Sequence, residues 1–204
     1  MGISAVKIID GQDYSLPILV TLVYFVLFQL FMVNQVKAKI DAGKGDPAKL
    51  NRFDYSNKFW EMADRSFMNF LEQTPAFVSL MWLCAVFCNA ESAGTAGLVY
   101  CVARAAFPVL WAVKGKWTLL IELSTQPCYA AVNYYNVCLL YLLCTGEQLR
   151  ALLPSNPVGV VGVVAGLQIA CTICVFFPGF AIASLMAKGF APAGELQEGL
   201  VANK

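Results

Sequence analysis

The amino-acid sequence predicts an all-α integral membrane protein with five transmembrane helices. The chain has 204 residues and is 59% hydrophobic but only 13% charged. Soluble domains carry about a quarter charged residues. The apolar residues also gather in segments that approach the roughly 20 residues needed to cross a bilayer. Lysines and arginines lie mostly in the connections between these segments.

Five spans are expected, separated by polar connections. They cover residues 16–36, 66–90, 98–113, 118–144 and 158–186. Pro17 suits the start of the first helix, and Gly43, Gly45 and Pro47 interrupt the chain after it. The stretch ESAGTAG at 91–97 is interpreted as a tight turn before the third span.

These spans divide the chain into five parts. They are an N-terminal segment (1–15), the four-helix bundle (16–145), a linker (146–157), the additional helix (158–186) and a C-terminal tail (187–204).

The distribution of basic residues predicts the orientation, because cytoplasmic loops are enriched in lysine and arginine. Ten of the 14 basic residues fall on one side of the predicted membrane: Lys37, Lys39, Lys44, Lys49, Arg52, Lys58, Lys114, Lys116, Lys188 and Lys204. Lys7 and Arg150 fall on the other side. The N-terminus is therefore expected outside and the C-terminus inside.

Several classes of function are excluded by composition. The chain has no histidine, which excludes histidine-ligated zinc or haem and the Ser-His-Asp and Cys-His catalytic arrangements. No metal site is expected. The net charge of +1 gives no indication of a nucleic-acid partner. The eight cysteines lie in or beside apolar segments and are interpreted as packing residues, with redox or metal work as the alternative.

Charged residues inside the spans are the main functional signal. Arg65, Glu72, Arg104 and Glu122 lie at membrane depth, and Asp64 lies at an edge. A charge at the bilayer centre costs at least about 2.5–3.5 kcal/mol, so it normally faces the bundle and finds a partner. Two arginines and two glutamates could neutralise each other in a structural cluster. Alternatively, they could line a cleft that binds a ligand.

The positions of three prolines favour the interpretation of these charged residues as the lining of a cleft. Pro75, Pro108 and Pro127 each follow one of these charged residues by three to five positions, so helix kinks are expected there. Non-helical backbone groups at membrane depth tend to line cavities. Arginines suit an anionic ligand because a guanidinium holds a carboxylate bidentately. Glu72 would remain available for an ammonium group, so the mixture suits a zwitterionic, peptide-like ligand.

Three stretches carry a family resemblance. In RSFMNFLEQTP, Arg65, Asn69 and Glu72 are spaced by four and three residues and followed by a proline. ARAAFPVLWAVKGK contains Arg104, and LSTQPCYAA contains a further proline. In order and spacing these stretches resemble the second, third and fourth helices of the membrane-associated proteins in eicosanoid and glutathione metabolism, the MAPEG family. That family includes microsomal glutathione transferases and microsomal prostaglandin E synthase.

The resemblance implies a four-helix protomer, a homotrimer, and glutathione as a cosubstrate held between neighbouring protomers at the end with the basic loops. Arg65, Asn69, Glu72 and Arg104 would contact glutathione, and Glu122 would belong to the same polar cleft. The resemblance also implies contact with membrane lipids and an intracellular membrane of a eukaryote, either the endoplasmic reticulum or another organelle.

The chain departs from the family at the positions linked to catalysis. Active members carry a histidine or tyrosine one turn after the third-helix arginine and a tyrosine two turns after it, where this chain has Phe107 and Trp111. Near the fourth helix they carry a thiol-activating arginine and, four residues later, a tyrosine. Trp117 and Ile121 stand near those places. Lys116 is the candidate for stabilising a thiolate, with a solvated loop lysine as the alternative.

Two functions remain open at this point. The first is a glutathione-dependent transferase or peroxidase that acts on lipophilic electrophiles. The second is a non-catalytic accessory or structural subunit of a larger membrane complex that keeps the MAPEG fold. Gly162 and Gly166 in the fifth span favour the second, because small residues let membrane helices approach closely. A transporter or channel is disfavoured, since the five spans show no inverted repeat.

Overall fold

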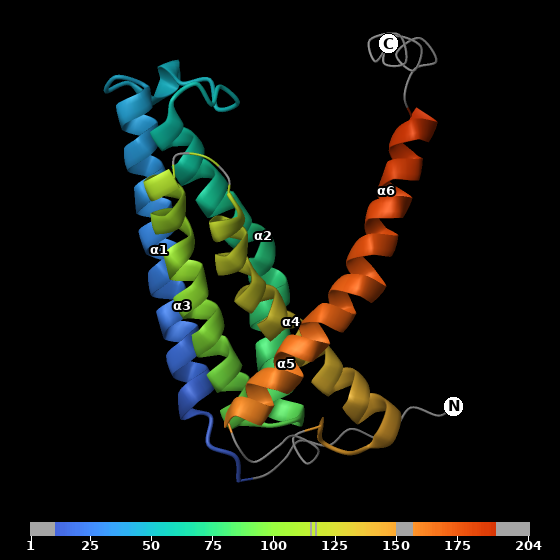
Figure 1. Cartoon of the computed structure of the whole chain (residues 1–204). Coiled ribbons are helices and arrows are strands. Elements are labelled where there is room, and N and C mark those ends of the chain that lie inside the picture. Colours follow the sequence, from blue (N-terminus) through green and yellow to red (C-terminus); the bar gives the residue numbers. More distant parts are fainter. Residues whose placement is uncertain (1–10, 115, 117, 150–156, 191–204) are drawn as a thin grey trace.

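The computed structural model describes residues 11–114, 116, 118–149 and 157–190, and every regular element in these ranges is helical. Four long helices form an antiparallel bundle, and a last long segment crosses α4 and then leaves the bundle (Figure 1). The bundle helices are α1 (Ser15–Ala42), α2 (Lys58–Phe87), α3 (Ala90–Lys114) and α4 (Leu119–Thr145), with the short η1 (Pro47–Lys49) between the first two. The last segment comprises α5 (Pro157–Cys171), the π-helical η3 (Thr172–Phe176) and α6 (Phe177–Phe190).

Five helical stretches are long and apolar enough to cross a membrane. They are α1 to α4 and the stretch Gly162–Met186. The protein is therefore a multi-pass, all-α integral membrane protein, which confirms the predicted fold class. The second helix begins at Lys58 rather than at residue 66 because Asn57 caps it. The Asn57 side chain accepts hydrogen bonds from the backbone N–H groups of Phe59 and Trp60 at 3.0 and 3.1 Å.

The connections that carry most of the basic residues lie at one end of the bundle. Figure 1 shows the α1–α2 connection and the end of α3 on the same side, and α6 also ends on that side. The arrangement is the one that the lysine and arginine bias predicted, although Lys7, Arg150 and Lys204 lie outside the described residues.

The interpretation of residues 91–97 as a tight turn is wrong, because all of them are helical and belong to α3. The connection from α2 to α3 consists only of Cys88 and Asn89. The Asn89 side chain accepts a hydrogen bond from the backbone N–H of Ser92 at 2.8 Å. This cap satisfies a free amide at the start of α3 and lets the helix begin before the glycines.

The two glycines of that stretch serve helix packing instead. A Cβ atom added at Gly94 would lie 2.6 Å from Cγ of Leu16, and one added at Gly97 would lie 2.7 Å from Cγ1 of Val20. Leu16 and Val20 belong to α1. The glycines therefore let α1 and α3 approach more closely than any larger residue would allow.

A stack of aromatic rings forms the core of the bundle. The Tyr24 ring of α1 lies between Phe70 and Phe77 of α2, with ring centroids 4.7 and 5.0 Å away. Phe77 in turn stacks on Tyr100 of α3 at 3.8 Å. The Tyr24 hydroxyl is hydrogen-bonded to Thr74 Oγ1 at 2.6 Å. These contacts join three helices around rings that are fully buried.

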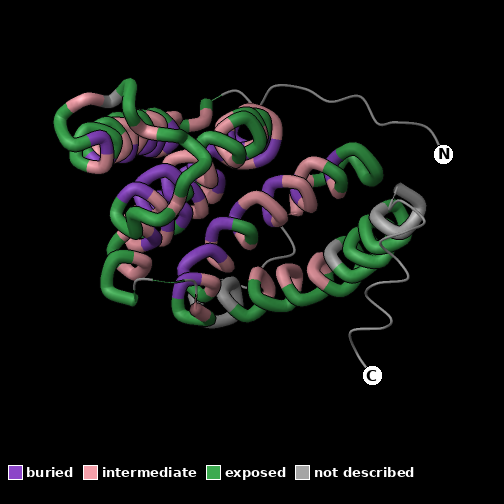
Figure 2. The backbone as a smooth tube through the Cα atoms, turned by 90° about the horizontal axis from the view of Figure 1, so that it is seen from above, coloured by how far each residue is buried: buried purple, intermediate pink, exposed green. Residues whose placement is uncertain are grey.

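The fifth span is joined to the bundle by side-chain amides. Gln168 of α5 donates a hydrogen bond to Oε1 of Gln126 at 3.0 Å and accepts one from Nδ2 of Asn133 at 2.7 Å, both on α4. We call these three residues the amide ladder. Figure 2 shows that buried residues concentrate within the four-helix bundle, whereas the last segment is mostly exposed.

We expect Gly97→Ala to destabilise the bundle, because the new methyl group would overpack the α1–α3 contact at a cost of about 1–3 kcal/mol. Gly162→Ala is the matched control, since nothing lies within 4 Å of a Cβ atom added there. Thermal unfolding in detergent should show a lower midpoint for Gly97→Ala and an equal or higher one for Gly162→Ala. Equal midpoints for Gly97→Ala and the unmodified protein would contradict the packing role.

Candidate functional site

A polar cleft of about 370 Å³ lies between α2, α3 and α4, at the end with the basic connections. Its lining residues are Lys58, Glu61, Arg65, Met68, Asn69, Glu72, Phe107, Trp111, Lys116, Glu122, Thr125 and Tyr129. Lys58 and Glu61 form an ion pair of 2.7 Å. Both cations and carboxylates therefore face one hollow.

Five of the predicted site residues line this cleft: Arg65, Asn69, Glu72, Lys116 and Glu122. The first three share a face of α2, because positions three and four apart in a helix lie above one another. Glu122 comes from the first turn of α4, and Lys116 from the connection before it. Residues far apart in the sequence thus meet at one place.

Arg104, the sixth predicted residue, lies behind the cleft and is fully buried. Its Nη1 donates to Oδ1 of Asn69 and its Nη2 donates to Oε1 of Gln73. The Tyr100 hydroxyl also donates to Oε1 of Gln73, at 3.0 Å. The guanidinium lies 5.5 and 5.6 Å from the ring centroids of Tyr100 and Phe107. Arg104 therefore positions Asn69, and its charge is held by amide oxygens and aromatic rings.

The charges at membrane depth do not neutralise one another. Within the described residues, no ion pair includes Arg65, Glu72, Arg104 or Glu122. Oε1 of Glu122 accepts a hydrogen bond from Nε2 of Gln126 at 2.8 Å. The structure thus lacks the cluster of paired charges that was the alternative to a cleft, and it leaves the carboxylates facing the cleft.

Arg65 lines the cleft and is held by the ring of Tyr55, which is itself bound to the buried Asp64 carboxylate. Its Cζ lies 5.1 Å from the ring centroid of Tyr55, a cation–π distance. The Tyr55 hydroxyl donates to Oδ2 of Asp64 at 2.8 Å, and Gln35 of α1 donates to Oδ1 at 2.7 Å. Arg52 approaches the same carboxylate at 3.9 Å. The pKa of Tyr55 is raised above its ordinary value, mainly because its hydroxyl donates this hydrogen bond to Asp64.

Sequence reasoning missed three residues of this region. Gln73 is the second acceptor for Arg104, and Thr125 and Tyr129 line the cleft beside Glu122. The spacing of Glu122, Thr125 and Tyr129, three and then four residues, would have indicated one helical face. Gln73, one position after Glu72, offered no comparable signal.

The positions that depart from the family form an apolar wall. Phe107 and Trp111 line the cleft, with ring centroids 5.6 Å apart. The other two such positions do not contribute to this wall: Ile121 is fully buried and does not line the cleft, and Trp117 lies outside the described residues. An apolar surface therefore stands next to the charged groups.

The chemistry of the cleft rests on cations, carboxylates and a phenol. No group of three or more His, Cys, Asp or Glu side chains that could hold a metal ion occurs in the described part of the chain. The eight cysteines are free, and none of them lines the cleft. The arrangement can bind a zwitterion and stabilise negative charge through Arg65 and Lys116.

Comparison with known protein families finds a match. The family model of the MAPEG family matches residues 15–120, just over half of the chain. The match covers α1, α2 and α3 completely and reaches the start of α4. No curated protein and no solved structure matches the chain significantly. The chain belongs to the MAPEG family and is a membrane protein of the glutathione and eicosanoid metabolism kind.

Proposed function

We propose that the protein is a glutathione-dependent transferase or peroxidase that acts on lipophilic electrophiles, with glutathione bound in the polar cleft. The observation that carries this proposal is the mixture of charges around one hollow, with Arg65, Glu72 and Glu122 outside any ion pair of the described residues. Glutathione itself has two carboxylates, one ammonium group and two peptide bonds. The cleft volume of about 370 Å³ falls within the range of about 300–1,000 Å³ for small-molecule sites.

A carboxylate, the ammonium group and a peptide carbonyl of the ligand each have a complementary residue in the cleft. Arg65 suits a carboxylate because its guanidinium can donate two parallel hydrogen bonds. Glu72 suits the ammonium group. Asn69 accepts from Arg104 through Oδ1, which leaves its amide N–H groups to donate to a peptide carbonyl. Arg104 therefore supports binding by fixing the orientation of Asn69.

Arg65→Ala and Glu72→Gln should each weaken glutathione binding by roughly 10- to 100-fold, because a hydrogen bond to a charged group contributes about 1.5–3 kcal/mol. Lys39→Ala is the matched control, since Lys39 is exposed at the same end of the bundle but does not line the cleft. Isothermal titration calorimetry of the protein in detergent measures all three. Absence of saturable binding, or an equal loss in Lys39→Ala, would remove the support for this site.

The reaction would place an activated thiol beside the apolar wall. A thiolate is the nucleophile, and free thiols have a pKa of about 8.5. Lys116 is the proposed group that stabilises it, because a nearby cation favours the charged form. Phe107 and Trp111 offer an apolar surface for the electrophile next to the charged groups.

Lys116→Ala should raise the pKa of bound glutathione. With Lys116 present, we expect the thiol pKa to lie below its solution value, so the thiolate persists to lower pH. Without the cation, the pKa should return to about 8.5. Ultraviolet absorbance of the thiolate, recorded against pH at saturating glutathione, measures this shift, and Lys116→Arg should preserve it. An unchanged pKa in Lys116→Ala would show that this lysine is only a solvated loop residue.

The proposed assembly is a homotrimer with glutathione between neighbouring protomers. The proposed location is a eukaryotic intracellular membrane, either the endoplasmic reticulum or another organelle. Membership of the MAPEG family supports both proposals.

A second function, as an accessory subunit of a larger membrane complex, is favoured by the last helical segment. No described side chain in the span Gly162–Met186 is buried, and α6 makes its main contacts with η3. Ile182, Leu185 and Met186 are 58%, 68% and 57% exposed. Such a surface suits contact with another membrane helix as well as with lipid.

If the accessory role holds, purification from the native membrane in a mild detergent should retain unrelated subunits. Alanine replacement of Gly162 and Gly166, which have open space around them, should then weaken that association by crowding a helix–helix contact. The bundle should keep its thermal stability in the same variant. An isolated homotrimer with thiol-transferring activity would contradict the accessory role.

A further inference from the structure

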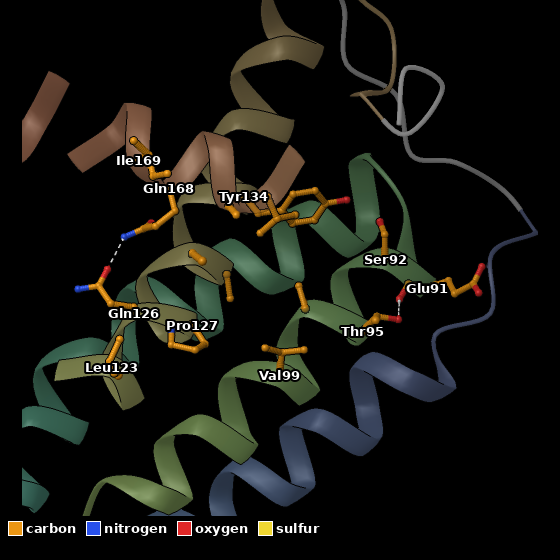
Figure 3. Close-up of a pocket in the computed structure, with 15 residues that line it drawn as sticks. Glu91, Ser92, Thr95, Val99, Leu123, Gln126, Pro127, Tyr134, Gln168 and Ile169 are labelled. Carbon is orange, nitrogen blue, oxygen red and sulfur yellow. Dashed lines mark hydrogen bonds between the residues drawn. The ribbon is translucent and has the colours of Figure 1, made fainter. Parts of the chain in front are cut away.

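A second hollow lies on another face of α4 and shares no lining residue with the polar cleft. It is a groove of about 580 Å³ between α3, α4 and α5 (Figure 3), and its lining runs from Glu91 near the start of α3 to Leu123 near the start of α4. We propose that this groove binds one membrane lipid that carries an ammonium group in its headgroup. The proposal is independent of glutathione binding, because the groove and the polar cleft share no lining residue.

The groove exists because small side chains face one another across three helices. They are Ala96 of α3, Ala130 and Ala131 of α4, and Ala165 of α5. The amide ladder fixes α5 at one edge of the groove, where Figure 3 shows Gln168 bonded to Gln126. The amide ladder and the neighbouring alanines thus leave a space between the helices that no side chain of the described residues fills.

The location restricts the ligand to molecules dissolved in the bilayer. The lining belongs to α3, α4 and α5, all of which contribute membrane spans. Most of it is apolar, with Val99, Leu123 and Ile169 among the larger members. An acyl chain satisfies such a lining because it has no polar groups to leave unpaired.

The polar end of the groove selects the headgroup. Glu91 is exposed near the start of α3, and Ser92 and Thr95 lie beside it at the same end of the groove (Figure 3). Glu91 is the only charged residue among those that line the groove in the described part of the chain. A carboxylate attracts an ammonium group and repels the carboxylate of a free fatty acid. The expected occupant is therefore a phosphatidylcholine-type or phosphatidylethanolamine-type lipid, in the leaflet opposite the basic connections.

Photolabelling tests the site in the full-length protein. The full-length protein is held in micelles of an uncharged maltoside detergent with a trace of phosphatidylcholine that carries a diazirine in one acyl chain. After illumination, we expect saturable labelling of α3, α4 and α5 residues that line the groove. Ala165→Trp and Ala130→Trp should each reduce this labelling several-fold by filling the space. Val102→Trp is the control, because Val102 on α3 is 72% exposed and does not line the groove.

Competition tests the headgroup. Unlabelled phosphatidylcholine should displace the probe better than phosphatidylglycerol or palmitic acid, and Glu91→Gln should reduce that preference. Thermal unfolding of each variant checks that it remains folded. Labelling that both Ala165→Trp and Ala130→Trp leave unchanged would overturn the site. Equal competition by palmitic acid in the unmodified protein would overturn the assignment of the headgroup.

Discussion

The Arg104 guanidinium is fully buried between α2 and α3 and needs hydrogen-bond acceptors at membrane depth, where water is scarce. Asn69 and Gln73 supply them from α2. An arginine paired with a carboxylate would have consumed one of the acidic residues of the cleft. Because amide oxygens and two aromatic rings hold Arg104 instead, Glu72 and Glu122 remain at the surface of the hollow. The cleft keeps its carboxylates because Arg104 is bound by amide oxygens rather than by Glu72 or Glu122.

The same contact ties the site to the core. Tyr100 donates to the Gln73 oxygen that accepts from Arg104, and its ring stacks on Phe77 within the aromatic core. The side chain of Asn69 is thus positioned by a chain of contacts that begins among fully buried rings. A binding group held this way loses little conformational entropy when a ligand arrives.

Much of the fold could be predicted from the sequence, because span length and charge bias are properties of the chain itself. The number of spans and the shared face of Arg65, Asn69 and Glu72 required only apolar run length and helical spacing. Gly94 and Gly97 led to the wrong prediction of a turn at 91–97, because glycine is favoured both in turns and where two helices pack closely. The role of Gln73 was not predictable, because it depends on how α3 is placed against α2.

The hydrogen bonds across α4 have a direction. The Glu122 carboxylate can only accept, so Gln126 must turn its NH₂ group toward it. The Gln126 oxygen then points to α5 and accepts from Gln168, whose own oxygen accepts from Asn133. The Glu122 carboxylate thereby orients the three side chains of the amide ladder. α4 is thus a partition whose two sides share one hydrogen-bond polarity, and Glu122→Gln would remove the constraint that keeps this polarity in a single sense.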